Sequence, residues 1–574
     1  MVLEKIQTGG IKNCTRNQLN VLCDELRSVI CDTVTRRGGH LASNLGAVES
    51  TVALFYTFDF PKDKIVFDVG HQCYPYKLLS GRLDRFDTLR QQGGISGFPK
   101  RKESEYDCYD TGHAGTSVSA AIGLAKARDL LHAEYTVIAY IGDGSFNNGL
   151  VYEALNSLKI LGTKVLIVLN DNGMSISPTV GGMHEILENI NAVNGAKEIK
   201  LLESFGLEYI GVKDGNDLEE MLDAFSEAKT KLQNGSVLLH IATKKGKGYE
   251  FSEEHPMDTH GVSPTGAGKQ REYSEILGET LCEMAKDNEK VCVVSAAMKE
   301  SLGLSAFFEK YPERAFDVGI CEENASVLCA AMAAGGLKPY YAIYSTFLQR
   351  AFDEIIHDVC AMDLPVTFCI DRAGISGADG ETHQGVFDLS YLSMIPNLTI
   401  WCPKDCDEFK KMLLKSEEFK RPLAIRYPRA GASFFEKTEE TDLFKWEYLF
   451  KKEGNELVIL AAGERCLTLA MKVLEGLRQR GKSADIINAR TVKPLDEATL
   501  RNLKNKYIVT MEDNVLLGGF GSMVNTFIVQ SGKQVSVKNY AYRDEFIAHG
   551  SVPKLQSEYG VDVEEILRYA DGIL

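Results

Sequence analysis

The stretch TVIAYIGDGSFNNGLVYEALNSLKILGTKVLIVLNDN, residues 136–172, decides the fold of this chain. Two apolar runs, 136–141 and 164–169, have the length and the β-branched content of buried strands. Residues 151–161 between them have the apolar spacing of a helix. The stretch therefore predicts a strand–turn–helix–strand unit. Units of this kind build parallel sheets, which bind ligands at the carboxyl ends of their strands.

Polar residues follow both predicted strands at that end. Gly142-Asp143-Gly144 closes the first strand, and Asn172 closes the second. A carboxylate and an amide oxygen are hard donors suited to Mg2+, which typically takes few protein ligands together with substrate phosphates. The glycines beside Asp143 let the backbone approach a diphosphate closely. The sequence thus predicts a magnesium–diphosphate anchor without indicating which diphosphate it holds.

The composition is that of an ordinary globular protein. With 574 residues the chain is too long for one core and predicts three or four domains, and 44% of its residues are hydrophobic and 25% charged. A net charge of -16 argues against nucleic-acid or anionic-membrane partners, which need basic surfaces. No apolar run reaches the length of a membrane span, and the first residues lack a signal-peptide layout.

The 14 cysteines are scattered, and many lie in apolar runs. No Cys-x-x-Cys pair occurs, and Cys402 with Cys406 has no second pair to complete a zinc site. We interpret the cysteines as reduced, buried thiols and expect a cytoplasmic protein.

Three α/β segments can be separated along the chain: 1–266, 269–432 and 446–574. Polar passages at 260–268 and 437–442 divide them. Within each segment strand-like and helix-like runs alternate, for example the helix-like 273–287 and the strand-like 291–294. This alternation predicts an α/β protein with parallel sheets throughout.

Glycine-rich turns in the first segment carry histidines. His71 follows a strand-like run, His113 precedes a helix-like run, and His40 lies in a third such turn. Each histidine alone is more often structural than functional. Three of them in turns of this kind beside a predicted metal anchor favour a functional interpretation.

The second segment offers acids and a polar loop. Glu322 and Glu323 precede an alanine-rich helix, where acids also simply complement the helix dipole. Residues 371–385 form a long polar loop carrying Arg372, Asp379 and His383, a composition typical of substrate-binding loops. Arginines elsewhere in this segment, Arg350 and Arg429, could form phosphate forks, with surface ion pairs as the alternative.

The anchor from Gly142 to Asn172 resembles the thiamine-diphosphate motif of transketolase-like enzymes. Further strings resemble the 1-deoxy-D-xylulose-5-phosphate synthase family in particular, over nearly the whole chain. They are GHQCYP (70–75), NDNGMSIS (170–177), TKKGKGY (243–249), AIYSTFLQR (342–350), and DRAG (371–374) with THQG (382–385).

The resemblance implies a transketolase-like fold of three domains. These are a diphosphate- and magnesium-binding domain (1–266), a pyrimidine-binding domain (269–432) and a C-terminal transketolase-type domain (446–574). It also implies a homodimer, with each active site between domains of one chain. The implied cofactors are thiamine diphosphate and Mg2+.

The resemblance also implies roles for residues at matching positions. Mg2+ would be held by Asp143, Asn172 and the Met174 carbonyl. The cofactor would be lined by His71, Gly112, His113, Ala114, Gly144, Ser145, Asn172 and Tyr249, with Phe347 stacked on its pyrimidine ring. Glu322, rather than Glu323, would bond that ring. Proton transfer is expected from His40, His260 and His383. The phosphorylated acceptor would be held by Tyr344, Arg350, Arg372 and Arg429, with Asp379 nearer the reacting carbons.

The expected reaction joins pyruvate to glyceraldehyde 3-phosphate with loss of carbon dioxide. One alternative is a transketolase-type ketol transferase acting on sugar phosphates, and another is a non-catalytic paralogue. The paralogue would have lost Glu322, Asp143 or Asn172, and all three are present. The chain departs from the family pattern at Glu323-Asn324, Tyr76, 146–148 and a shortened segment after Ser177, which leaves the acceptor specificity open.

Overall fold

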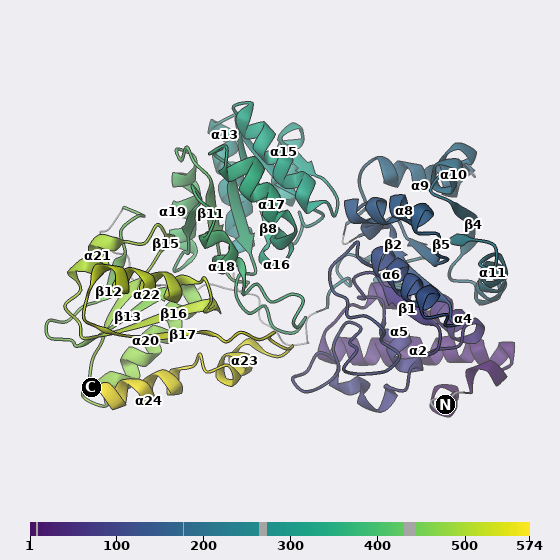
Figure 1. The fold of residues 1–574 in the computed structure, drawn as a ribbon, viewed down its shortest axis with the longest axis horizontal. Helices are drawn as coiled ribbons and strands as arrows, with labels where there is room; N and C mark the ends of the chain where they lie inside the picture. The colour runs from purple at the N-terminus through teal and green to yellow at the C-terminus, as the bar shows by residue number, and fades with distance from the viewer. Residues whose placement is uncertain (7–9, 176, 194, 263–271, 430–434, 436–441) are drawn as a thin grey trace. The chain divides into compact units, whose positions relative to one another are not determined.

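The structure is a computed structural model of the 574-residue chain, and it describes all residues except 7–9, 176, 194, 263–271, 430–434 and 436–441. Two compact units make up the chain (Figure 1). The first is Met1–Gly268 with Gly319–Cys321, and the second is Lys269–Val318 with Glu322–Leu574. The predicted domain limits 266, 269 and 432 lie outside the described residues.

The first unit contains a fully parallel sheet in the order β1-β2-β3-β5-β4. Its strands are β1 (Lys64–Phe67), β2 (Val137–Gly142), β3 (Leu166–Asp171), β4 (Leu207–Asp214) and β5 (Ser236–Ala242). The strand–turn–helix–strand prediction is confirmed, because β2 and β3 pair in parallel and α8 (Gly149–Leu161) connects them.

Helices cover both faces of this sheet because its strands are apolar on both sides. Ile138 and Tyr140 of β2 belong to one core cluster, whereas Ala139 and Ile141 belong to another. Figure 1 shows α6 beside β2 within this unit, and α6 and α8 contribute to the same core cluster. The helical segments are α1 (Val2–Ile6), η1 (Ile11–Asn13), α2 (Arg16–Arg37), α3 (Ala42–Leu45), α4 (Val48–Thr57), α5 (Tyr74–Leu79), η2 (Leu83–Thr88), α6 (Ser117–Leu130), α7 (Asp143–Phe146), α8, α9 (Gly182–Val193), α10 (Ala196–Glu203), α11 (Leu218–Lys231) and α12 (Glu250–Glu254).

The second unit contains two sheets. The order of the first is β15-β10-β11-β9-β8-β6-β7 and that of the second is β12-β14-β13-β16-β17. The strands of the first sheet are β6 (Val291–Ser295), β7 (Ala315–Asp317), β8 (Lys338–Tyr344), β9 (Thr367–Asp371), β10 (Thr399–Trp401), β11 (Leu423–Arg426) and β15 (Thr491–Lys493). Those of the second are β12 (Glu447–Phe450), β13 (Leu457–Ala462), β14 (Asp485–Asn488), β16 (Tyr507–Val515) and β17 (Ser536–Tyr542).

The prediction of parallel sheets throughout is wrong at two edges. β15 pairs antiparallel with β10, and β12 pairs antiparallel with β14. Parallel neighbours need a crossover connection, usually a helix, whereas short edge strands reached without one can pair in either direction. The chain passes from β14 to β15 through only Ala489 and Arg490, so β15 joins the edge of the neighbouring sheet of its unit.

The remaining helices pack on these two sheets. They are α13 (Tyr273–Asp287), α14 (Ser305–Lys310), η3 (Pro312–Arg314), α15 (Glu322–Ala334), α16 (Ser345–Leu348), η4 (Gln349–Ala351), α17 (Phe352–Glu354), η5 (Ile355–Cys360), α18 (Asp388–Ser393), α19 (Cys406–Ser416), α20 (Glu464–Gln479), α21 (Glu497–Asn502), α22 (Phe520–Ser531), α23 (Val552–Glu558) and α24 (Val563–Ile573). Among the described residues, no helix combines the length and apolarity that crossing a membrane requires.

Candidate active site

The carboxyl ends of β2 and β3 bring Asp143 and Asn172 into contact. Asp143 begins α7 directly after β2, and Asn172 follows β3. One carboxylate oxygen of Asp143 accepts the Asn172 backbone N–H at 3.4 Å, and the other accepts the Thr179 hydroxyl at 2.7 Å. The Met174 N–H donates to the Asn172 side-chain oxygen at 3.2 Å, which folds the turn back on itself. The three expected metal ligands therefore lie together in the first unit.

Burial gives this turn an unusual electrostatic character. Burial and, secondly, the charge of nearby Asp171 raise the pKa of Asp143 to about 7. Lys245 is also buried, which lowers its pKa to about 8 although Asp143 opposes the change. Its ammonium group donates to the Ser175 carbonyl. Lys245 was missed as a site residue, although it lies inside the TKKGKGY string.

These donors fit a magnesium ion. Two buried carboxylates, Asp143 at 1% and Asp171 at 5% exposure, lie close enough to raise the pKa of one of them, and a cation would relieve that repulsion. One carboxylate, one amide and a backbone carbonyl match an ion that completes its coordination with phosphates and water. No group of three or more His, Cys, Asp or Glu that could hold a metal occurs in the described part of the chain.

Three of the expected histidines gather in the first unit. The ring centroids of His40, His71 and His260 are 5.4 to 5.6 Å apart in each pair. Burial, Lys245 and the other two histidines hold the pKa of His260 well below its usual value, so His260 is neutral near pH 7. The residues are far apart in sequence, and the backbone pairing of Gly39 with Val262 brings His260 beside His40.

A buried asparagine holds two of these histidines in place. The Asn44 side-chain amide donates to the carbonyls of His40 at 2.6 Å and His71 at 2.7 Å. Its oxygen accepts the Tyr74 N–H at 2.7 Å. Asn44 is fully buried, and both its side-chain donor hydrogens and its oxygen make hydrogen bonds, so it fixes both histidine-bearing turns. The sequence offered no periodic or motif signal for this role.

The turn of Gly112, His113 and Ala114 is fixed by Asp68, which follows β1. The Asp68 carboxylate accepts the N–H groups of Gly115 at 2.7 Å and Ser117 at 3.0 Å. Gly115 has a φ of +83°, and a Cβ there would lie 2.4 Å from the Asn148 side-chain oxygen. The turn therefore requires glycine for both conformation and space.

The remaining residues of this unit that the sequence assigned to the cofactor lie in different surroundings. Gly144 and Ser145 lie in α7, and a Cβ on Gly144 would lie 2.8 Å from Ser175 Cβ, so this turn is tightly packed. Tyr249 is 42% exposed, and its ring contacts Phe251 with centroids 6.4 Å apart. No contact described within this unit joins Tyr249 to the histidine cluster.

Two departures from the family pattern have structural explanations. Tyr76 is buried among aromatic rings, including Phe55 and Phe67, and donates to the Tyr106 carbonyl at 2.8 Å. It is a core residue. Asn148 caps α8 by accepting the Leu150 N–H at 3.1 Å.

The second unit carries the buried acid expected beside a pyrimidine ring. Glu322 is the first residue of α15 and is 3% exposed. Burial raises its pKa to about 7, with Arg350 opposing and Glu323 adding to the effect. Its Oε2 has no hydrogen-bond partner within the described part of the chain, whereas Glu323 is half-buried. A buried, unpaired carboxyl of near-neutral pKa can hold or release a proton toward a ligand.

Aromatic and cationic groups of the same unit form a contiguous cluster. The Arg372 guanidinium lies 3.7 Å from the centre of the Tyr344 ring, which stacks on Phe347 at 5.7 Å. The His383 ring meets Phe347 edge-on at 5.6 Å, and its Nδ1 lies 2.9 Å from the Thr382 hydroxyl. Four of the expected residues are thus brought together from β8, α16 and the loop after β9.

The loop after β9 is closed at its base and packed against the rest of the unit. Gly374 and Gly385 exchange backbone hydrogen bonds at 2.7 and 2.8 Å. The Gln384 side chain accepts the Ser376 N–H at 2.7 Å and donates to the Ala548 carbonyl at 3.1 Å. Asp379 is half-buried in this loop.

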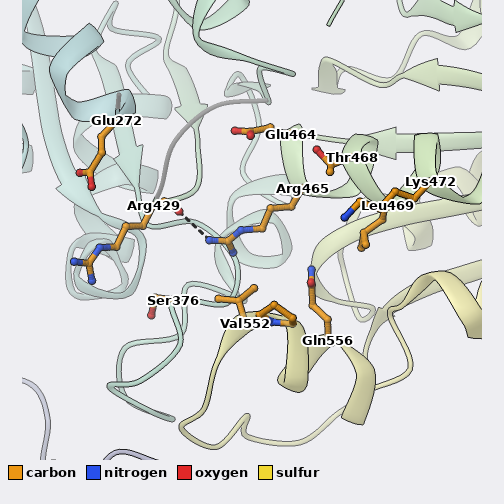
Figure 2. Close-up of a pocket in the computed structure, with 11 residues that line it drawn as sticks. Glu272, Ser376, Arg429, Glu464, Arg465, Thr468, Leu469, Lys472, Val552 and Gln556 are labelled. Atoms are coloured by element: carbon orange, nitrogen blue, oxygen red, sulfur yellow. Dashed lines mark hydrogen bonds between the residues drawn. The ribbon is translucent and has the colours of Figure 1, made fainter. Parts of the chain in front are cut away.

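Arg429 lines a pocket of about 490 Å³ bounded by α20 and α23. Figure 2 shows its side chain turned away from Arg465, whose guanidinium donates to the Arg429 carbonyl at 3.0 Å. The charge of Arg429 nevertheless reaches the Arg372 region. Burial raises the pKa of Asp371, and Arg372 and, more weakly, Arg429 oppose that rise.

Three family models together match most of this chain. The family model described as 1-deoxy-D-xylulose-5-phosphate synthase matches residues 3–200 and 191–243. The models for the transketolase pyrimidine binding domain and the transketolase C-terminal domain match residues 269–432 and 446–566. The solved transketolase from Campylobacter jejuni is 19% identical, with a TM-score of 0.47, covering 97% of this chain and 100% of that one.

The matches to these family models define an α/β enzyme of the transketolase class. A 1-deoxy-D-xylulose-5-phosphate synthase from Clostridium botulinum is 44% identical over 598 residues, covering 96% of both chains. One from Carboxydothermus hydrogenoformans is 43% identical, covering 98% of both. The chain belongs to the 1-deoxy-D-xylulose-5-phosphate synthase family.

Proposed function

We propose that this protein catalyses the decarboxylative condensation of pyruvate with glyceraldehyde 3-phosphate, using thiamine diphosphate and Mg2+. The observation that carries the proposal is Glu322, a buried acid of near-neutral pKa with an unpartnered oxygen. It occurs in a chain that also keeps the Asp143 and Asn172 turn. A non-catalytic paralogue would have no reason to retain a buried carboxyl whose ionisation opposes folding.

Different residues would hold the metal, the diphosphate and the pyrimidine ring. Asp143, Asn172 and the Met174 carbonyl would hold Mg2+. The diphosphate side would be lined by His71, Gly112, His113, Ala114, Gly144, Ser145, Asn172 and Tyr249. Glu322 would hold a proton toward the pyrimidine ring, and Phe347 would stack on that ring. When bound, thiamine diphosphate supplies a nucleophilic carbon and an electron sink.

The chain's own residues would bind the acceptor and move protons. The Arg372 guanidinium is fixed over the Tyr344 ring and is therefore a preorganised phosphate donor. Arg350 and Arg429 are further candidates for the phosphate. His40, His260 and His383 are candidates for proton transfer, and the depressed pKa of His260 keeps it neutral at neutral pH. Asp379 would lie near the reacting carbons.

Assembly and location form part of the same proposal. We infer domains at 1–266, 269–432 and 446–574, supported by the spans of the three family models. A homodimer follows from the family resemblance. A cytoplasmic location is supported by the 14 cysteines, because they are reduced thiols and such thiols persist in a reducing compartment.

The test is to incubate the purified protein with thiamine diphosphate, Mg2+, pyruvate and glyceraldehyde 3-phosphate and to identify the products by NMR. We expect 1-deoxyxylulose 5-phosphate and carbon dioxide. Exchange between ketose phosphates without pyruvate consumption would instead identify a transketolase-type ketol transferase. The variant Glu322→Ala should abolish turnover while Glu323→Ala retains it. The reverse pattern would show that the wrong acid had been assigned.

A further inference from the structure

A chain of buried polar groups lies directly behind the predicted metal-binding turn. It joins Asp171, His240 and Tyr209, which come from β3, β5 and β4. His240 Nε2 lies 3.0 Å from Asp171 Oδ2, and His240 Nδ1 lies 2.9 Å from the Tyr209 hydroxyl. His240 is fully buried and Asp171 is 5% exposed. The assigned cofactor and acceptor residues do not include any of the three.

The parallel register explains why these side chains meet. β3, β5 and β4 are neighbours, and their residues pair Leu169 with His240 and Tyr209 with Leu238. Side chains two residues apart on a strand share a face. Asp171, His240 and Tyr209 therefore stand on one face of the sheet, although they are separated by 69 and 31 positions in sequence.

Chemistry fixes the direction of each bond. An ionised carboxylate can only accept hydrogen bonds, so His240 Nε2 donates to Asp171. In the tautomer that carries its proton on Nε2, the other ring nitrogen is an acceptor, and the Tyr209 hydroxyl donates to it.

Asp171 is coupled to the turn by further bonds. Its Oδ1 accepts the Gly173 N–H at 3.1 Å, and its Oδ2 also accepts the Asn191 amide at 2.8 Å. Asn172 lies between Asp171 and Gly173 in the chain. The orientation of the Asp171 carboxylate therefore determines the path of the turn that carries Asn172 and Met174.

We propose that His240, supported by Tyr209, is a positioning residue for magnesium. Its bond to Asp171 holds the turn in the conformation that presents Asn172 and Met174 to the metal. This inference rests on the proposed magnesium site. Groups that orient metal ligands from outside the coordination sphere typically change metal affinity by ~10–100-fold when they are removed.

The test measures metal binding directly. Purified protein with saturating thiamine diphosphate is titrated with Mn2+, and free Mn2+ is followed by its electron paramagnetic resonance signal. His240→Leu keeps the side-chain volume but removes both bonds, and we expect its Mn2+ Kd to rise by ~10–100-fold. His240→Gln keeps a donor toward Asp171 and should bind nearly as tightly as the natural protein.

A matched control separates positioning from loss of buried bonding in general. Tyr140 is fully buried in the same sheet, and its hydroxyl lies 2.9 Å from the Ser50 hydroxyl. Tyr140→Phe should leave the Mn2+ Kd unchanged, whereas Tyr209→Phe should raise it by a few-fold. The Mg2+ concentration for half-maximal activity should rise in His240→Leu by the same factor as the Kd, with turnover restored at saturating Mg2+.

The outcomes separate failure of the positioning role from failure of the proposed magnesium site. If the natural protein binds no Mn2+ with thiamine diphosphate, the proposed magnesium site is wrong. If it binds Mn2+ and His240→Leu binds equally well, the positioning role is wrong. The same conclusion follows if His240→Gln is as weak as His240→Leu. Should His240→Leu not fold, equal Mn2+ affinities of Tyr209→Phe and Tyr140→Phe would overturn the inference.

Discussion

Replacing Glu322 by glutamine should make the cofactor-free protein more stable, and increasingly so as the pH rises. Glutamine keeps the shape of the side chain but cannot ionise. Glu322 is 3% exposed, and burial raises its pKa from 4.5 to about 7. The native state therefore keeps this proton in a pH range where the unfolded chain has already released it. In that range the stability of the natural protein falls as the pH rises.

The magnitude follows from the two pKa values. Below pH 4.5 both states are protonated and Glu322 has no differential effect. From pH 4.5 to about 7 each pH unit costs about 1.4 kcal/mol, which amounts to about 3 kcal/mol above pH 7, where both states are ionised. Because part of this cost has accumulated at pH 5.5, the advantage of Glu322→Gln should grow by about 2 kcal/mol between pH 5.5 and pH 8.

The assay is thermal unfolding of both proteins without thiamine diphosphate or Mg2+, at several pH values between 5.5 and 8. The Tm difference between the two proteins should widen with pH. Glu323→Gln is the matched control, because it removes a half-buried acid from the same helical turn. A Tm difference for Glu322→Gln that is independent of pH, or equal to that of Glu323→Gln, would refute the raised pKa and with it the proton-holding role.

Three further predictions concern the cofactor and the acceptor. Asp143→Asn removes the proposed charged metal ligand. Mn2+ binding should therefore weaken by more than the ~100-fold that loss of an outer-sphere group can cause. A smaller loss would mean that the ion is held elsewhere. Arg350→Ala should raise the KM for glyceraldehyde 3-phosphate about tenfold or more by deleting a charge-assisted phosphate bond, with the pyruvate KM unchanged. An unaltered acceptor KM would exclude that role. Gly144→Ala places a Cβ 2.8 Å from Ser175 Cβ and should raise the thiamine diphosphate concentration for half-maximal activity. Gly123→Ala meets no atom within 4 Å inside a helix and should stabilise the protein by up to ~1 kcal/mol; comparable cofactor affinity in both alanine variants would contradict the packing argument.

Strongly periodic elements were predictable because their pattern is local. The helix expected at 273–287 is observed as Tyr273–Asp287, and the strand expected at 291–294 is observed as Val291–Ser295. The antiparallel edge strands β12 and β15 were not predicted. They have four and three residues, too few to show a pattern, and their direction depends on which sheet edge is free.

The proximity of Asp143 and Asn172 was foreseeable for a related reason. Adjacent parallel strands end at the same edge of a sheet, so Asp143 and Asn172 had to lie close together once β2 and β3 paired. No such rule predicts the residues that support the site. Asn44 reaches His71 across 27 positions, and His240 reaches Asp171 across 69. Polar residues buried by such long-range contacts look like any others in the sequence.

The sequence by itself determined the α/β class and the order of strands and helices in the main segments. It also determined that Asp143 and Asn172 follow two neighbouring strands. These depend on local periodicity and on chain direction. Only the tertiary structure decided that Glu322 is fully buried whereas Glu323 is half-buried, and that His40, His71 and His260 share one cluster. Burial and proximity arise from packing between distant segments, and the pKa values on which the proposed chemistry depends are set by that packing.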